Sequence, residues 1–312
     1  KLPGATCRET DEPLPYGRDV QLQGNTDLVG GVSDGRVGAA VMDYDRDGVR
    51  AHKAWFFLPD GWVALGAGIT STTEDPLTSS VNQCLLKSEV RLLRHTQVAP
   101  LAEPEVRGDD IRGVYHDGVG YYLLDPQWTV VRAAEQRGTW TSIEARSPVT
   151  GTVTQDVFSL WIEHGAHPAG GTYAYRVVPD LSAEAWASYP DAASVAVLAN
   201  DARVQAVASA DGTLVQSIFY EPGRLNLDGY MIVEVAEPCA LMLRRAEDKV
   251  TLSVADPAQR LETLSVCLSG RHTGPSARYG PEDETTTVTV DLPGDGFAGR
   301  TVQVALRPVA PV

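Results

Sequence analysis

Turn signals that separate short apolar runs constrain the fold of this chain more than any other feature. Asp34-Gly35, Asp47-Gly48 and Asp117-Gly118 supply the residue types that tight turns prefer. Brief strand-like runs, such as residues 37–42 and 120–124, lie between such signals, and long stretches with helical periodicity are missing. This pattern predicts an all-β protein built from large antiparallel sandwiches.

The densest apolar stretch predicts a β-hairpin. Residues 54–58 and 62–65 flank the turn residues Pro59-Asp60-Gly61, and neither run alternates with polar residues. We therefore expect both strands to be buried on both faces. Gly66 and Gly68 indicate a bulge or a close backbone approach. Residues 70–80 are small and rich in hydroxyl groups, and we expect an ordered loop there that lies outside the core.

Two breaks in the pattern suggest how the chain is organised. A serine cap followed by Ala-Glu-Ala-Trp-Ala predicts a helical turn at residues 182–188. Tyr189-Pro190-Asp191 then marks a break, so we place a boundary near residue 190, with domains at 1–190 and 191–312. An exposed loop is expected at 271–284. Later strands are expected at 194–198, 204–208, 214–220, 231–235, 240–244, 250–254, 263–267, 286–291 and 301–306.

Composition excludes two classes of partner. The chain carries 41 acidic and 26 basic residues, and its formal charge of −15 argues against nucleic acid, which needs a basic face. Its apolar runs are too short to span a bilayer, so no membrane partner is expected. The first residues do not resemble a secretion signal, and such a signal, in an exported protein, is expected upstream.

Four cysteines, Cys7, Cys84, Cys239 and Cys267, lack the spacing of a zinc site. Cys239 and Cys267 both lie in apolar runs of the second half. Two alternatives follow: these two face each other across paired strands, or they are buried free thiols. The sequence permits three full pairings and does not choose among them.

A resemblance to a known family appears once these blocks are read together. The hairpin and the residues after it resemble the central β-domain of polysaccharide lyase family 8, which includes hyaluronate, chondroitin AC and xanthan lyases. Residues 2–6, 30–35, 161–165, 173–175, 205–207 and 253–257 resemble the family in the same order. The matching hairpin positions are Lys53, Trp55, Phe56, Phe57, Leu65, Gly66, Gly68, Ile69 and Asn82.

The resemblance implies a super-sandwich like that of galactose mutarotase, followed by a smaller C-terminal β-domain. It implies a secreted parent enzyme that cleaves uronate-containing polysaccharides such as hyaluronan, chondroitin or xanthan by β-elimination. The family's catalytic residues lie in an N-terminal α/α-toroid, and this chain has no segment that matches it. We therefore assign no catalytic residue here and expect the chain alone to be inactive. Its acidic charge requires local Arg or Lys clusters to attract an acidic polysaccharide.

The same resemblance suggests two sites. In the family the first residues lie beside the substrate groove, which implies a groove role for Arg8 and Glu9; the alternative is a solvated salt bridge. Asp43, Asp45 and Asp47 have the spacing that opens a calcium loop, but Ala54 occupies the twelfth position, which excludes an EF-hand. Because some family members bind Ca²⁺ in this domain, a different calcium site is one alternative. An acidic hairpin turn is the other.

Histidines and aromatics are expected to be largely structural. His164 and His167 leave a strand into a turn, so we expect a structural role instead of a metal pair, and His116 is interpreted as a hairpin residue. Most aromatics lie in apolar runs, but Trp128 and Trp140 are expected to show a face to solvent. A competing hypothesis for the whole chain is a stand-alone carbohydrate-binding or scaffolding β-protein.

Overall fold

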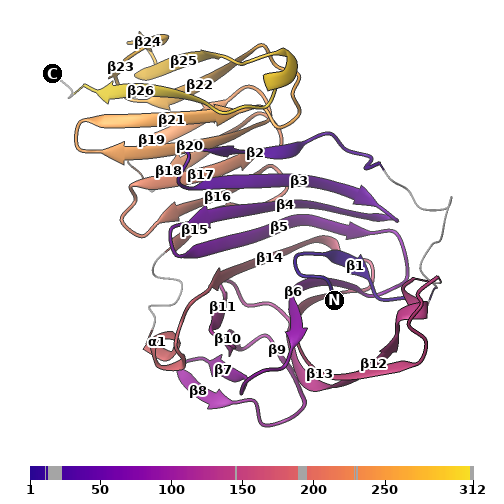
Figure 1. Ribbon diagram of the computed structural model, residues 1–312. Coiled ribbons are helices and arrows are strands. Elements are labelled where there is room, and N and C mark those ends of the chain that lie inside the picture. Colours follow the sequence, from indigo (N-terminus) through magenta and orange to yellow (C-terminus); the bar gives the residue numbers. More distant parts are fainter. Residues whose placement is uncertain are drawn as a thin grey trace. The chain divides into compact units, whose positions relative to one another are not determined.

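The computed structural model is built almost entirely from antiparallel strands, which confirms the all-β prediction (Figure 1). It describes residues 1–10, 12, 23–144, 146–188, 195–227, 229 and 231–309. Within these residues, no helix is long and apolar enough to cross a membrane.

The chain divides into two compact units. Unit 1 comprises Lys1–Asn25, Asp45–Arg50 and Ile69–Tyr189, and unit 2 comprises Thr26–Tyr44, Ala51–Gly68 and Pro190–Val312. The boundary that we expected near residue 190 falls in the segment 189–194, which lies outside the described residues. The domain limits 1–190 and 191–312 therefore stay a prediction.

Unit 1 contains a five-stranded sheet whose two faces differ in chemistry. Phe158, Leu160 and Ile162 on one face of its long strand β13 are buried, while Ser159 and Glu163 lie on the other face. This alternation follows from the two-residue period of a strand. In order across the sheet, the strands are β1 (Thr6–Arg8), β6 (Leu77–Leu85), β13 (Thr152–Gly165), β12 (Thr129–Thr139) and β9 (Glu105–Gly108).

A second group of strands in unit 1 packs against the α-helix α1 (Ala183–Ser188). Its order is β14 (Ala169–Val178), β11 (Val119–Leu123), β10 (Ile111–His116), β7 (Arg91–Arg94) and β8 (Gln97–Pro100). The helix α1 confirms the predicted helical turn, and the Ser182 hydroxyl accepts the backbone N–H of Ala185 at 3.1 Å. Trp186 anchors the helix, because it is buried against Tyr122 and Val178.

The loop expected at 70–80 is wrong at both ends, because Thr70 and Ser71 belong to β5 and only residues 72–76 form a loop. Residues 77–80 belong to β6 and are almost fully buried. The hydroxyl groups of Thr78 and Ser79 are buried without loss because they pair with other polar groups, whereas the buried hydroxyl of Ser80 has no hydrogen-bond partner among the described residues. Thr6 Oγ1 lies 2.8 Å from Ser79 Oγ, which in turn lies 2.8 Å from His164 Nε2. Hydrogen bonding therefore takes the place of apolar packing here.

The predicted hairpin at residues 54–65 is confirmed. In sheet order, β2 (Val29–Ser33), β3 (Gly38–Arg46), β4 (Val49–Leu58) and β5 (Gly61–Ser71) follow one another. Residues 63–67 of β5 are buried throughout, as expected. The expectation is wrong for β4, where Phe57 is 44% exposed because its side chain borders a surface hollow.

Gly68 confirms the expected close approach of the backbone. Its φ of +60° lies in the left-handed region, and a Cβ atom there would meet the Cβ of Ala202 at 3.3 Å. The two-residue turn Asp47-Gly48 joins β3 to β4 with φ values of 53° and 75°. Positive φ at both positions is typical of the tight turn that suits a twisted hairpin.

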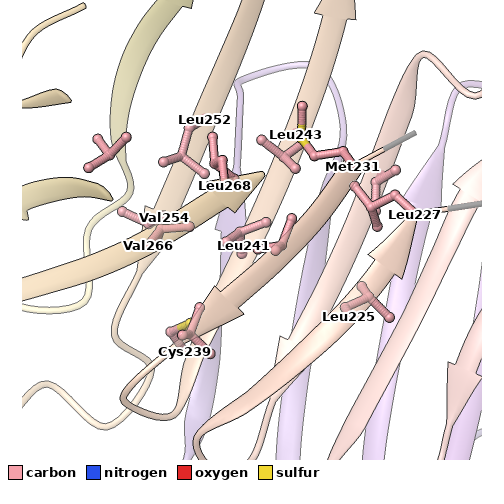
Figure 2. Packing of buried hydrophobic residues seen from close by; sticks show 14 of the residues in the cluster. Leu225, Leu227, Met231, Cys239, Leu241, Leu243, Leu252, Val254, Val266 and Leu268 are labelled. Carbon is pink, nitrogen blue, oxygen red and sulfur yellow. The ribbon is translucent and has the colours of Figure 1, made fainter. Parts of the chain in front are cut away.

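The second half of unit 2 is a sandwich of two sheets around one apolar core (Figure 2). Leu241 and Leu252 from one sheet and Val266 and Leu268 from the other are almost completely buried. The first sheet has the order β15 (Val195–Asn200), β16 (Val204–Ser209), β17 (Leu214–Phe219), β20 (Cys239–Ala246), β21 (Lys249–Ala255), β26 (Val302–Pro308) and β23 (His272–Thr273). The second has the order β18 (Gly223–Leu227), β19 (Met231–Val235), β22 (Thr263–Ser269), β25 (Thr285–Asp291) and β24 (Ala277–Gly280).

All nine predicted later strands are present, but the exposed loop expected at 271–284 is wrong in part. It contains the short strands β23 and β24, and His272 is buried. The backbone N–H of His272 donates to Thr286 Oγ1 at 2.9 Å, and that hydroxyl donates to the Gly270 carbonyl at 2.8 Å. These hydrogen bonds hold a polar segment against the sheet.

All four cysteines are free thiols, which rejects pairing of Cys239 with Cys267; the alternative of buried free thiols holds for Cys239, whereas Cys267 is half-buried. The two residues lie on different sheets, in β20 and β22. Cys239 is completely buried in the apolar core, and burial raises the pKa of its thiol. It behaves as a small hydrophobic residue.

The core prediction concerns Leu252, which is fully buried on β21. Leu252→Ala removes buried methyl groups and leaves a cavity, so we expect the free energy of unfolding to fall by about 2–5 kcal/mol. Urea denaturation followed by circular dichroism measures the change. The matched control is Lys249→Ala, an exposed position on the same strand, which should change stability little; an equal loss in both variants would contradict this account of the core.

Candidate functional site

A groove with a volume of about 1060 Å³ lies on the polar face of the five-stranded sheet in unit 1. The strand period places every second side chain on this face. On β13 these residues are Ser159, Trp161 and Glu163, and the register pairs Ser159 with Arg132 on β12. The other side chains of the groove are Lys1, Leu2, Ala5, Cys7, Glu9, Pro76, Leu77, Thr78, Gln83, Glu105, Arg107, Trp128 and Gln136.

Of the two residues expected in a groove, the structure places only Glu9 there. Glu9 forms an ion pair with Lys1 and accepts a hydrogen bond from the Thr78 hydroxyl at 2.7 Å. Arg8 lies outside the lining and its guanidinium pairs with Asp75 at 2.8 Å. Glu9 directly follows β1, and its N–H donates to the Pro76 carbonyl at 2.8 Å, so the extended alternation continues and Cys7 and Glu9 line the groove while Arg8 does not. The role of either residue toward a ligand stays a prediction.

The ionisation of Glu9 is set by two opposed effects. Partial burial would raise its pKa, but hydrogen bonds from Lys1 and Thr78 and the charge of Lys1 outweigh burial and hold the pKa below its ordinary value. Glu9 is therefore an ionised carboxylate at neutral pH. It can accept hydrogen bonds but is not poised to donate a proton.

Charges in the groove are balanced. Lys1, Arg107 and Arg132 face Glu9, Glu105 and Glu163. Arg107 contacts both Glu105, at 2.7 Å, and Glu163, at 3.2 Å. The groove is thus close to neutral, although the chain as a whole carries a formal charge of −15. A local balance of this kind removes the repulsion that an acidic ligand would otherwise meet.

Two tryptophans give the groove an aromatic surface. Trp128 is 49% exposed, which confirms the expectation for this residue, and Trp161 lies almost buried beneath the Lys1 ammonium, 4.9 Å from its ring centre. Trp140, 51% exposed, is also confirmed, but it lies at a separate hollow near the end of β12. An exposed indole face can stack against a sugar ring.

The three candidate calcium ligands each contact a basic side chain. Asp45 pairs with Arg50 at 2.9 Å, Asp47 lies 3.4 Å from Arg46, and Asp43 lies 3.5 Å from His52 Nε2. Among the residues that the structure describes, no three His, Cys, Asp or Glu side chains are grouped so that they could hold a metal ion. Calcium binding at Asp43, Asp45 and Asp47 stays a prediction.

Each of the histidines singled out in the sequence has a protein partner. His164 contacts Ser79, and His167 Nε2 lies 2.9 Å from Glu74, which raises the pKa of His167. His116 is buried at the end of β10, where its Nε2 accepts the N–H of Lys87 at 3.2 Å. Burial lowers its pKa. These contacts favour the structural role that the sequence predicted.

Sequence reasoning missed most of the groove, including Arg107, Arg132, Trp161 and Glu163. A usable signal existed in β13, where Ser159, Trp161 and Glu163 alternate with three large apolar residues. The pairing of β12 with β9 and of β6 with β1, which completes the groove, joins segments far apart in sequence. Local patterns do not specify such partners.

Comparison with known proteins identifies the family to which this fold belongs. Residues 1–190 match the family described as "Polysaccharide lyase family 8, super-sandwich domain", and residues 196–265 match its "C-terminal beta-sandwich domain". The chain is therefore a member of polysaccharide lyase family 8, as the resemblance implied, and has the super-sandwich and C-terminal sandwich of that family.

Individual relatives agree with this assignment. Chondroitinase-AC of Pedobacter heparinus is 34% identical over 311 residues, which cover 97% of this chain and 42% of that protein. Xanthan lyase of a Bacillus species is 28% identical over 261 residues, 79% of this chain and 28% of that protein. A solved structure of chondroitinase AC lyase with oligosaccharides superposes with a TM-score of 0.83 at 31% identity, over 96% of this chain and 43% of that one. The chain thus spans less than half the length of these relatives.

We expect the contribution of Glu9 to the stability of the fold to depend on pH. Because the pKa of Glu9 is lower in the folded chain than in the unfolded one, its ionised form stabilises the fold above the ordinary glutamate pKa. This contribution is lost as the pH falls through the lowered value. Glu9→Gln should therefore be less stable than the parent chain at neutral pH, and the difference should vanish in acid.

Partial exposure of Glu9 limits the effect to below about 1 kcal/mol. Urea denaturation at a series of pH values measures it. Glu247→Gln is the control, since Glu247 is exposed and has no ion pair with any described residue. A Glu9→Gln difference that stays constant into acid would show that the Glu9 charge is not its cause.

Proposed function

We propose that this chain is the β-portion of a secreted polysaccharide lyase that cleaves a uronate-containing polysaccharide, of the hyaluronan, chondroitin or xanthan type, by β-elimination. In this role the groove on the five-stranded sheet forms one side of the substrate cleft. A catalytic α/α-toroid of the same protein forms the other side and supplies the acid and base. The chain alone is then inactive.

The observation that carries the proposal is the combination of family membership with the groove. The curated relatives are lyases that act on chondroitin, xanthan and hyaluronate, and this chain aligns with less than half of each. The groove offers a half-exposed indole at Trp128 and the amide groups of Gln83 and Gln136, which the buried Ser159 hydroxyl links by hydrogen bonds. Such a surface suits a sugar chain, because stacking and amide hydrogen bonds together recognise pyranose rings.

Glu9 has a defined part in this proposal. Its carboxylate is ionised and held by Lys1 and Thr78, so its position is fixed. It can orient a neighbouring hydroxyl or guanidinium of the toroid by accepting a hydrogen bond. We place Glu9 as a positioning residue, not as the base that removes the C5 proton.

The alternative is a stand-alone carbohydrate-binding β-protein. The same groove supports that function, since stacking and hydrogen bonding do not require a lyase partner. The two functions differ in whether the polysaccharide is cleaved. A lyase creates an unsaturated uronate that absorbs in the ultraviolet, whereas a binding protein leaves the polymer intact.

The test incubates hyaluronan, chondroitin sulfate and xanthan with the 312-residue chain, and separately with a longer protein that includes the sequence preceding it, and follows ultraviolet absorbance. We expect product only from the longer protein. Turnover by the chain alone would overturn the claim that its catalytic groups lie outside these residues. Absence of turnover from both, with retained binding, would favour the alternative.

In the active longer protein, Trp128→Ala should raise the KM about three- to tenfold through loss of stacking. Trp140→Ala is the matched control, because Trp140 is equally exposed but lies outside the groove. Equal effects of the two substitutions would contradict the assignment of the groove as the cleft.

A further inference from the structure

A second hollow lies within unit 2, and we call it the Phe57 groove. Its volume is about 560 Å³. The hairpin of β2 and β3 and the segment before β26 form it, and β4 contributes the exposed ring of Phe57. The residues that matter for its chemistry are Gly31, Arg36, Gly38, Phe57, Arg300 and Thr301.

Glycine makes this surface hollow. A Cβ atom at Gly38 would lie 2.6 Å from the Val32 carbonyl oxygen, so the paired strands pack too closely for a side chain there. Gly31 lies in β2 of the same hairpin, and a Cβ atom there would collide with the Ala39 carbonyl oxygen. With Gly35 and Gly299, these glycines leave much of the lining as bare backbone. The Phe57 ring, 44% exposed, borders an open surface instead of core.

The charge of the Phe57 groove is opposite to that of the chain. Arg36 and Arg300 line it, and none of its described lining residues is acidic. Both arginines are exposed, and neither forms an ion pair with any residue that the structure describes. The Arg300 guanidinium lies over the Phe297 ring, 5.9 Å from its centre, a contact that does not neutralise its charge. In a chain with a formal charge of −15, two guanidinium groups without an acidic partner beside the exposed Phe57 ring are a local exception.

The carboxylate of Asp34, two residues before Arg36, is already engaged. Its Oδ1 accepts the backbone N–H groups of Arg36 and Val37, at 2.9 and 3.0 Å. Its Oδ2 accepts two hydrogen bonds from Arg244. Burial would raise the pKa of Asp34, but these hydrogen bonds outweigh it and hold the pKa below its ordinary value. Asp34 therefore fixes the turn that carries Arg36 without neutralising Arg36.

The walls of the Phe57 groove are held together before any ligand binds. The Ser33 N–H donates to Thr301 Oγ1 at 3.0 Å, which joins the hairpin to the segment before β26. Gln216 Nε2 donates to the Phe57 carbonyl at 3.0 Å and fixes the backbone of β4. Figure 1 shows β2 alongside β20, and contacts between these strands and between β2 and β21 agree. A preformed site loses little conformational entropy when it binds a ligand.

We propose that the Phe57 groove binds an acidic oligosaccharide at a site separate from the groove of unit 1. One sugar ring stacks on Phe57, and carboxylate or sulfate groups pair with Arg36 and Arg300. Guanidinium groups form paired hydrogen bonds with such anions, and an aromatic face accommodates the apolar side of a pyranose. The choice of an acidic sugar polymer as ligand rests on the proposed function. Such a site would hold the polymer without cleaving it.

The test titrates the ¹⁵N-labelled 312-residue chain with hyaluronan and chondroitin sulfate oligosaccharides and follows backbone amide resonances. We expect the signals of Gly35 and Thr301 to shift on binding. In Arg36→Gln/Arg300→Gln the dissociation constant from these signals should rise about tenfold, because two charged hydrogen-bond donors are lost. Phe57→Ala should weaken binding about threefold or more.

Matched controls use residues of unit 2 that do not line the Phe57 groove. Arg224→Gln/Arg278→Gln removes two exposed arginines, and Tyr279→Ala removes an exposed aromatic ring. Both should leave the dissociation constant unchanged. Thermal unfolding of every variant checks that the fold is retained, and if Phe57→Ala is unstable, Phe57→Leu keeps the apolar volume and removes the ring.

Several results would overturn the proposal. These are unshifted Gly35 and Thr301 signals, equal weakening in the control variants, or the same shifts with polyglutamate or with uncharged dextran. Failure of this proposal can be distinguished from failure of the proposed function. Turnover is measured with the longer protein, whereas binding is measured at the amides of Gly35 and Thr301 in the 312-residue chain. Turnover without these shifts rejects the Phe57 site alone. Shifts without turnover retain the site and reject the lyase.

Discussion

Alternation of side chains along β12 and β13 is the constraint on which the candidate site depends. Because neighbouring residues of a strand point to opposite faces, one series of residues builds the core and the other builds the groove. Phe158, Leu160 and Ile162 pack inward while Ser159, Trp161 and Glu163 line the hollow. The apolar face therefore supplies the rigidity that holds the polar face in place, and the site and the core cannot be altered independently.

The two hollows differ in how their charged side chains are paired. In the groove of unit 1 each cation has an acidic neighbour, as Arg107 has Glu105 and Glu163, so its side chains are fixed in position and nearly neutral together. In the Phe57 groove, Arg36 keeps its charge available because Asp34 is committed to backbone N–H groups and Arg244, and Arg300 forms no ion pair with any described residue. A surface whose charges are paired is suited to orienting a ligand, whereas a surface with a net positive charge is suited to attracting an acidic ligand from solution.

Local sequence signals predicted the strands and turns but not the sites. The hairpin at 54–65, the helix at 182–188 and the later strands follow from turn residues and apolar runs, which act over a few residues. Residues 77–80 were misassigned because three of them are serine or threonine, although hydrogen bonds from distant partners allow Thr78 and Ser79 to be buried. Glu9 came from the family resemblance. Arg107 and Trp161 were missed, since strand pairing over long separations brings them together.

The buried hydroxyl groups of β6 have a consequence for the start of the chain. Strand β1 is only three residues long, and so short an element gains little from apolar contact alone. Apolar contact tolerates sliding, whereas a hydrogen bond between Thr6 and Ser79 is satisfied in one alignment only. A slip of one residue would break that bond and turn Glu9 to the other face of the sheet. The hydrogen bond between Thr6 and Ser79 therefore fixes the register of β1 against β6, and this register determines the face of the sheet on which the Glu9 carboxylate lies.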